Sequence, residues 1–358
     1  MLGIKNKMNI TISISSRLQE ITSWLDFNEK LYSTKDFWNS ELNQYIIPNE
    51  FTNSAIVIDS QPFVSMLTED LGFESLIRCC KNNHLVVYDS HDCFNNLTYN
   101  KELLVALDKL IPKNSLILFL EAKINKTSFF YQLNNIKFYD FWWHWQWGYP
   151  FRIKGSSTAK KKNSNNYLCT MRKKSGAYHR ELLYNQLKKK KLLDKGIVSY
   201  QSSNDKSIWI GDKTQQHPWQ DGHASMDLYN NCWLEVVPET LYIENYFVTE
   251  KTIKPWITKT PFLALSSPGY LNFLQSLGFK TFNSLIDESY DSEQDINFRT
   301  KKLVDVLDDI IENGTENFYH ASKDILDHNY NRFAEIAGSR LHILDSMFHD
   351  CLGELFDV

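Results

Sequence analysis

The sequence predicts an α/β protein with two domains and a helical C-terminus. Short aliphatic runs alternate with longer segments in which apolar residues recur every three or four positions, which is typical of alternating strands and helices. This alternation is interrupted by one polar, lysine-containing stretch and then begins again. At 358 residues and 42% hydrophobic content, the chain is long enough to bury two cores.

The first domain is expected over residues 1–150. Its β-rich runs predict four buried parallel strands, at 9–15, 54–59, 84–89 and 115–122. Helical periodicity over 62–80 and 101–111 fills the last two intervals between them. Strands joined by helices in this way form a parallel sheet with right-handed crossovers.

A linker or mobile basic loop is expected at 151–166, because this stretch is rich in Ser, Asn, Gly and Lys. The second domain then covers 167–358. Its expected strands are 167–171, 196–200, 207–211, 233–237, 261–267 and 280–286, and its expected helices are about 177–193, 249–259, 268–278 and a helical region at about 299–356.

Charge and cysteine content narrow the class of protein. Lys and Arg total 39 against 43 Asp and Glu, so no global basic field exists to hold nucleic acid indiscriminately. No apolar stretch is long enough for a membrane helix, and the N-terminus lacks the apolar core of a secretory signal. The six cysteines show no CxxC spacing, which argues against a disulfide framework or a zinc ribbon. A soluble, cytoplasmic protein with reduced and mostly buried thiols is therefore expected.

Several familiar motifs are absent from the sequence. There is no GxxxxGK[ST] and no GxGxxG, so neither a P-loop nor a standard dinucleotide fold is supported. There is also no HExxH, no GxSxG and no Asp-x-Asp metal clamp at a strand end. We therefore expect no bound metal and no cofactor.

The most informative position is a helix start at Thr249. Thr249 is a good N-cap residue, and Glu250 and Lys251 lie in the first turn. The free N–H groups and the positive dipole end of such a helix suit a phosphate, while Lys251 adds a charge and Glu250 could accept both hydroxyls of a ribose. A nucleoside diphosphate would use all three features. The alternative is a capped surface helix whose Glu and Lys side chains are solvated.

The segment Phe247 to Lys251, with Glu239 and Thr240 upstream, resembles the Y-V-T-E-K block and preceding Glu-Asn of the α1,3-fucosyltransferases and their phage and bacterial relatives. Residues 167–187 are similar to the strand, basic loop and arginine-bearing helix of that family and place Arg180 at its phosphate-binding arginine. The resemblance covers roughly 167–291. It departs from the family in Thr240, which replaces Asn, and in a spacing between the two motifs that is one residue longer.

This resemblance implies a GT-B glycosyltransferase, with two Rossmann-like domains facing across a cleft. The N-terminal domain would bind the acceptor and the C-terminal domain the sugar nucleotide. Glu250 would bind the ribose, Lys251 and Arg180 the diphosphate, and Glu239 the donor sugar or its surroundings. The resemblance favours a GDP-sugar donor. Because the sequence has no metal clamp, we expect a metal-independent reaction, with inversion at the anomeric carbon, in the cytoplasm of a bacterium or a virus-infected host cell.

An inverting transfer needs a base that deprotonates the acceptor hydroxyl. The best candidates are Asp92 and Asp89, followed by His91, because ligands of open α/β sheets bind beyond the carboxyl ends of the strands. Asp59 and Glu121 end neighbouring strands and remain in contention. Taken singly, each of these could instead cap a helix or lie solvated in a loop.

The acceptor is left open between a glycan, the default, and a hydroxymethylated base in viral DNA. Trp143, Trp145 and Trp147 would form one aromatic face of a strand, which could stack on a sugar or a flipped base or could simply pack in a core. The basic loop at Lys160–Lys162 keeps a DNA acceptor possible. The rival class is a non-catalytic nucleotide- or DNA-binding module. The donor sugar and the oligomeric state are not predicted.

Overall fold

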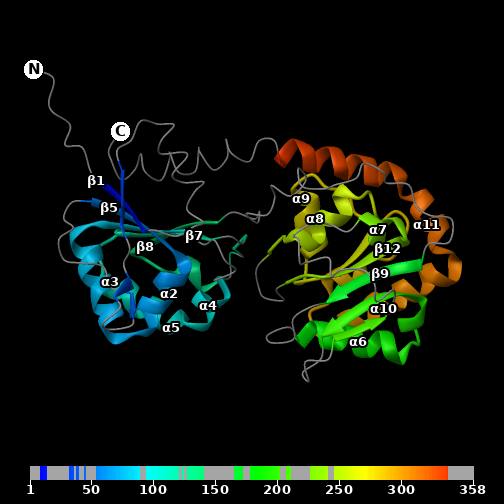
Figure 1. The fold of residues 1–358 in the computed structure, drawn as a ribbon, viewed down its shortest axis with the longest axis horizontal. Coiled ribbons are helices and arrows are strands. Elements are labelled where there is room, and N and C mark those ends of the chain that lie inside the picture. The colour runs from blue at the N-terminus through cyan, green and yellow to red at the C-terminus, as the bar shows by residue number, and fades with distance from the viewer. Residues whose placement is uncertain are drawn as a thin grey trace, which may run out of the picture. The chain divides into compact units, whose positions relative to one another are not determined.

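The computed structural model divides the chain into two compact α/β units (Figure 1). It describes residues 9–13, 32–35, 38–39, 44–45, 54–88, 94–120, 123–124, 126, 128–140, 165–171, 178–201, 207–210, 226–240 and 246–337. The expected linker at 151–166 lies almost wholly outside these residues, so the domain boundaries stay a prediction. Within the described part of the chain, no helix is both long and apolar enough to cross a membrane.

The first unit contains a six-stranded sheet in which every pairing is parallel. Its order is β2-β1-β5-β6-β7-β8. The strands are β1 (Asn9–Ser13), β2 (Tyr32–Lys35), β5 (Ser54–Asp59), β6 (His84–Tyr88), β7 (Leu116–Leu120) and β8 (Ile136–Asp140). A separate antiparallel ribbon joins β3 (Trp38–Asn39) to β4 (Gln44–Tyr45). The four predicted strands are thus confirmed, and the sheet extends by one strand at each edge.

Four helices of the first unit gather on one face of this sheet (Figure 1). They are α2 (Ser60–Thr68), α3 (Asp70–Asn82), α4 (Phe94–Tyr99) and α5 (Lys101–Leu110), and a 3-10 turn, η1 (Phe129–Gln132), precedes β8. The helical structure predicted over 62–80 is confirmed, but it forms two helices because the backbone becomes extended at Glu69. Gly72 permits the break, since a Cβ there would lie 2.6 Å from the Cα of Met66.

The described cysteines are buried and free, as the sequence predicted. Cys79 and Cys80 lie on α3, and Cys169 and Cys232 lie in the second unit. Burial raises the pKa of the Cys79 thiol to about 12. These thiols therefore stay protonated and act as small apolar side chains.

The second unit contains a five-stranded sheet with the order β11-β10-β9-β12-β13. The strands are β9 (Asn165–Met171), β10 (Gly196–Gln201), β11 (Ser207–Ile210), β12 (Cys232–Pro238) and β13 (Phe262–Leu265). All are parallel except β11, which runs antiparallel at one edge. The strand predicted over 280–286 is wrong. The amides of Leu285 and Ile286 both donate to the carbonyl of Phe282, which closes a turn there.

The order of strands in the second sheet reverses between β9 and β12. From β9 the chain passes through α6 (Tyr178–Lys189) to β10 on one side, whereas from β12 it passes through α8 (Glu250–Ile257) to β13 on the other. Right-handed crossovers in opposite directions put the two helices on opposite faces, as Figure 1 shows. The carboxyl ends of β9 and β12 therefore form the point at which open α/β sheets commonly bind ligands.

The remaining elements of the second unit surround the sheet. They are η3 (Leu193–Lys195), α7 (Met226–Asn230), α9 (Tyr270–Ser276), η4 (Ser289–Ser292), α10 (Ile296–Asn313), α11 (Thr315–Ala321) and a helix over 323–337. The predicted helical C-terminus is thus confirmed as far as 337, and the residues beyond it are not described. Helix α10 packs on α6, where Lys190 lies 2.9 Å from Asp305 and 3.2 Å from Asp308.

A tight turn links β13 to α9 and depends on a glycine. Gly269 has φ +81°, a conformation that costs an L-residue about 1–2 kcal/mol. A Cβ there would also lie 2.8 Å from the hydroxyl oxygen of Tyr246, whose ring stacks on Phe273. Both the backbone and its neighbour therefore require glycine at this position.

Gly269→Ala is expected to lower the free energy of unfolding by about 1–3 kcal/mol, measured by urea denaturation. Tyr246→Phe removes the hydroxyl that the new methyl would meet. In that background the same alanine should cost less, because only the backbone strain remains. Equal stability of Gly269→Ala and wild type would contradict this account of the turn.

Candidate functional site

The candidate site lies where β12 ends, at the reversal of strand order. All seven residues of β12 are buried, and the next residue, Glu239, continues the pairing by donating its amide to the carbonyl of Leu265 at 3.0 Å. Glu239 and Thr240 are therefore held at the carboxyl edge of the sheet. Segments from both faces of the sheet meet these two residues.

Helix α6 reaches this edge with its first turn. His179 Nε2 lies 2.8 Å and Arg180 Nη2 lies 3.1 Å from the carbonyl oxygen of Glu239. A carbonyl only accepts hydrogen bonds, so the imidazole carries its proton on Nε2. Both side chains are buried, with Arg180 only 4% exposed. The start of α6 is thus fixed to the end of β12.

Helix α8 reaches the same two residues from the other face. The Oγ1 of Thr249 accepts a hydrogen bond from the amide of Lys251 at 3.2 Å, so Thr249 is the N-cap, as predicted. The ammonium group of half-buried Lys251 donates to Thr240 Oγ1 at 2.8 Å. The positive end of this helix and the charge of Lys251 therefore act at one place.

Two cations from opposite faces of the sheet thus converge on consecutive residues, Glu239 and Thr240. Their fields overlap, because the charges of Arg180 and Lys251 both contribute to lowering the pKa of His179. Two positive charges beside a helix N-terminus favour an anion. Arg180, Glu239, Thr249 and Lys251 are therefore neighbours in the structure. Glu250 begins α8, but its side chain is outside the described part, so its contact with a ribose stays a prediction.

The carboxylate of Glu239 faces inward rather than toward solvent. Glu239 is 0% exposed. Its two oxygens accept hydrogen bonds from the amides of Thr240 and Thr249 and from the hydroxyls of Thr249, Thr252 and Tyr270. The predicted contact between Glu239 and a donor sugar stays untested, while the structure shows a buried anchor.

Three residues of this cluster were not singled out from the sequence. His179 could have been found, because it directly precedes Arg180 on the first turn of α6. Thr252 could also have been found, since it lies three residues after Thr249 and so on the same side of α8. Tyr270 gives no such signal, because it comes from α9 and meets Glu239 only through the fold.

The proposed bases fall at the edge of the described residues. Asp89, His91, Asp92 and Glu121 are outside them, and the side chain of Asp59 is not described. Strand β6 ends at Tyr88, so Asp89 directly follows the carboxyl end of a central strand. Lys160–Lys162 and the aromatic run from Trp143 to Trp147 also lie outside the described part of the chain. All of these roles stay predictions.

One carboxylate at the carboxyl edge of the first sheet is described. Asp140, the last residue of β8, accepts from the ammonium of Lys123 and from the amide of Ile124, both at 2.9 Å. This carboxylate therefore fixes Lys123 and Ile124, which follow β7, to the end of β8. Among the residues described, no group of three or more His, Cys, Asp or Glu is placed to hold a metal ion.

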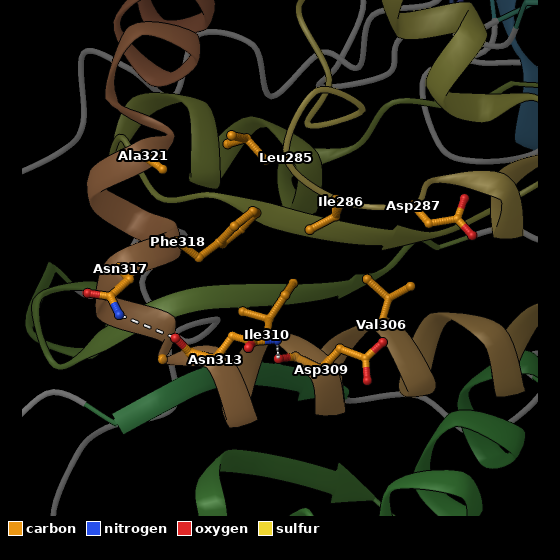
Figure 2. A pocket seen from close by; sticks show the side chains of 11 residues that line it. Leu285, Ile286, Asp287, Val306, Asp309, Ile310, Asn313, Asn317, Phe318 and Ala321 are labelled. Atoms are coloured by element: carbon orange, nitrogen blue, oxygen red, sulfur yellow. Dashed lines mark hydrogen bonds between the residues drawn. The ribbon is translucent and has the colours of Figure 1, made fainter.

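A cavity of about 410 Å³ lies elsewhere in the second unit, between α10, α11 and residues 285–287 (Figure 2). Its neighbour Thr315 hydrogen-bonds Asn166 at the beginning of β9, so the cavity lies toward the amino ends of the strands. Apolar side chains such as Ile310 and Phe318 line it, with Asp287 and Asp309 at one side. It is therefore separate from the cationic site at the carboxyl edge.

His179 makes the stability of the site dependent on pH. Burial, followed by the charge of Arg180, lowers its pKa from 6.5 to about 4. Between these values the unfolded chain binds a proton that the folded chain does not, so the folded state loses stability as the pH falls from 6.5 to 4. The loss associated with this group is roughly 3 kcal/mol.

His179→Gln keeps a hydrogen-bond donor but does not titrate. We expect the difference in free energy of unfolding between wild type and variant to shrink as the pH falls from 7 to 4, in urea denaturation at several pH values. Comparing the two proteins cancels the carboxylates that titrate in the same range. A difference that stays constant with pH would show that His179 is not buried in its neutral form.

Comparison with known proteins gives likeness in structure alone. No family model matches the sequence, and no curated protein matches it. A DNA-modifying β-glucosyltransferase, solved with and without uridine diphosphoglucose, is 12% identical with a TM-score of 0.44, covering 98% of this chain and 100% of that one. An α1,3-fucosyltransferase with GDP is 13% identical with a TM-score of 0.37, covering 95% and 92%.

An α1,3-fucosyltransferase solved with GDP-fucose is 10% identical with a TM-score of 0.35, covering 90% of this chain and 82% of that one. The α1,3-fucosyltransferases, which the sequence resembles, are thus among the solved structures similar to this chain. Identities and TM-scores this low do not establish a shared activity.

Proposed function

We propose that the chain is a glycosyltransferase of the GT-B class that transfers a sugar from a nucleoside diphosphate to an acceptor hydroxyl. The observation that carries this proposal is the convergence of Arg180 and Lys251 at the end of β12, next to the N-terminus of α8. Glycosyl transfer from such a donor releases a diphosphate on which negative charge grows. A site of this kind stabilises that charge through preorganised cations and amides.

The roles within the site follow from position and charge. Lys251 contacts the diphosphate directly, because its half-buried ammonium already lies at the helix start. Arg180 supplies a second positive charge that stabilises the diphosphate, and Glu250 accepts the ribose hydroxyls. The reaction proceeds without a metal ion, with inversion, and a GDP-linked sugar is the favoured donor because of the resemblance to fucosyltransferases.

The acceptor side of the reaction is proposed to lie on the first unit. Asp92, Asp89 or His91 takes the proton from the attacking hydroxyl, with Asp59 and Glu121 as alternatives. These residues follow or end parallel strands, whose carboxyl ends are the usual place for such groups. A glycan is the default acceptor, and a hydroxymethylated base in viral DNA is the alternative, motivated by the tryptophans and lysines at 143–162.

A panel of GDP-, UDP- and ADP-linked sugars tests the proposal, with binding followed by thermal shift. A ligand at 100 times its dissociation constant stabilises the folded state by about 2.7 kcal/mol, which is easily measured. We expect the sugar nucleotides of one nucleobase to stabilise the protein more than the others. We also expect that donor to be hydrolysed slowly, with release of nucleoside diphosphate. Binding without release would indicate a non-catalytic nucleotide-binding module, and no binding by any member would contradict the proposal.

The dependence of acceptor affinity on salt concentration distinguishes a DNA acceptor from a glycan acceptor. Binding to DNA should weaken steeply between 50 and 200 mM salt, because each phosphate contact releases counterions. A glycan acceptor carries no such row of charges, so its affinity should change little over the same range.

A further inference from the structure

We propose that Glu239 is a positioning residue that holds the two cations of this site in register and does not itself contact the donor sugar. The inference rests on the function proposed above for the cationic site. The buried carboxylate fixes residues 239 and 240, which bind Arg180 through the Glu239 carbonyl and Lys251 through the Thr240 hydroxyl.

Five donors from three separate elements meet the two carboxylate oxygens of Glu239. Oε1 accepts from the Thr249 amide at 3.0 Å, the Thr252 hydroxyl at 2.7 Å and the Tyr270 hydroxyl at 3.3 Å, while Oε2 accepts from the Thr240 amide at 2.8 Å and the Thr249 hydroxyl at 2.6 Å. The side chain thus joins the end of β12 to the start of α8 and to α9. With no exposed surface, it has little room for a further ligand.

The two amide donors explain why a carboxylate is required. Each oxygen accepts one backbone N–H, from Thr249 at Oε1 and from Thr240 at Oε2. A hydroxyl can rotate and become an acceptor, but a backbone N–H can only donate. Glutamine would place its NH₂ group against one of these amides in either orientation. The position therefore requires two acceptor oxygens, which only a carboxylate of this length supplies.

Two consecutive residues, Glu239 and Thr240, make the contacts to both cations. Glu239 accepts from His179 and Arg180 with its own carbonyl oxygen, and the next residue, Thr240, accepts from Lys251 with its hydroxyl. Because the carboxylate binds the Thr240 amide, it fixes the peptide between these two anchors. Through Thr249 it also fixes the first turn of α8, which carries Lys251.

The chain offers a matched control four residues earlier on the same strand. Glu235 is also buried, at 3% exposed, and accepts a hydrogen bond from the hydroxyl of Tyr229 at 3.1 Å. It lies within β12 rather than at its carboxyl end. Glu235→Gln therefore perturbs a buried glutamate inside β12, whereas Glu239→Gln perturbs the carboxylate that accepts the Thr240 and Thr249 amides.

The experiment compares Glu239→Gln with Glu235→Gln in the full chain, by calorimetric titration with GDP and UDP. We expect Glu239→Gln to raise the dissociation constant at least ~10-fold, as for a misplaced charge-assisted hydrogen bond, and Glu235→Gln to leave it unchanged even where both lower the melting temperature. Lys251→Ala should weaken nucleotide binding by a smaller factor in the Glu239→Gln background than in wild type. Unchanged affinity in Glu239→Gln, or full additivity, would overturn the proposal.

A second readout does not depend on nucleotide binding. In ¹⁵N NMR, the imidazole of His179 reports on its bond to the Glu239 carbonyl. Glu239→Gln should shift this signal, because the carbonyl that accepts from Nε2 moves, whereas Glu235→Gln should not. If Glu239→Gln fails to fold, Thr252→Val removes one of the five donors and should move both readouts in the same direction. Absence of any nucleotide binding in wild type would refute the proposed function, and unmoved His179 signals would refute the positioning role.

Discussion

Lys251→Ala is expected to weaken binding of the nucleoside diphosphate about 10- to 100-fold while leaving the fold intact. The ammonium lies at the start of α8, where it would make a charge-assisted hydrogen bond to a phosphate, worth about 1.5–3 kcal/mol. Its loss from the folded protein removes the half-buried hydrogen bond to Thr240, so stability should fall by about 0.5–1.5 kcal/mol. Titration calorimetry and urea denaturation measure the two effects separately.

Lys301→Ala serves as the control for this substitution. Lys301 is exposed on α10, where it pairs with Asp305 one helical turn away. Its removal takes away the same charge from the protein surface, so any general effect of net charge on nucleotide binding will appear there too. Equal affinities for Lys251→Ala and Lys301→Ala would exclude the start of α8 as the diphosphate site.

Asp291→Asn is expected to cause the largest loss of stability, about 3–5 kcal/mol, because it leaves a buried charge without its counter-ion. Asp291 Oδ1 lies 2.7 Å from Arg299 Nη2, and Arg299 is 0% exposed. Arg299 also donates to the carbonyl of Ser267, in the turn after β13. Arg299 thus joins α10 both to η4, through Asp291, and to the turn before α9, through Ser267.

Glu293→Gln is the matched control, since Glu293 pairs with Lys302 nearby on the surface at 2.8 Å. Exposed pairs contribute about 0–1 kcal/mol, so this variant should stay close to wild type in urea denaturation at pH 7. A loss for Asp291→Asn as small as that of Glu293→Gln would mean that the Asp291–Arg299 pair does not hold this part of the unit together.

The sheet architecture could be predicted from the sequence because buried parallel strands have a clear signature. The runs at 54–59 and 84–89 are aliphatic, short and separated by helical periodicity, and they form β5 and β6. The false strand at 280–286 shows the limit of that signature. Phe282 and Ile286 are apolar residues of a turn, and their spacing alone does not distinguish a turn from an irregular strand.

The candidate site was partly predictable for a similar reason. The N-cap at Thr249 is a local feature, so it can be read from neighbouring residues. The meeting of Lys251 with Arg180 near Glu239 is not local, since it depends on the order of strands in the sheet. From the sequence, only the resemblance to the α1,3-fucosyltransferases indicated that Arg180 and Lys251 belong to one site. No local pattern reveals that Glu239 is buried and bonded to Tyr270.

A crystal structure with the nucleoside diphosphate that stabilises the protein best tests the central claim most directly. We predict that a phosphate oxygen lies within hydrogen-bonding distance of Lys251 Nζ and of the first amides of α8, with the Glu239 carboxylate still bound to Thr249 and Thr252. A diphosphate found in the cavity between α10 and α11, or away from the carboxyl end of β12, would contradict the account.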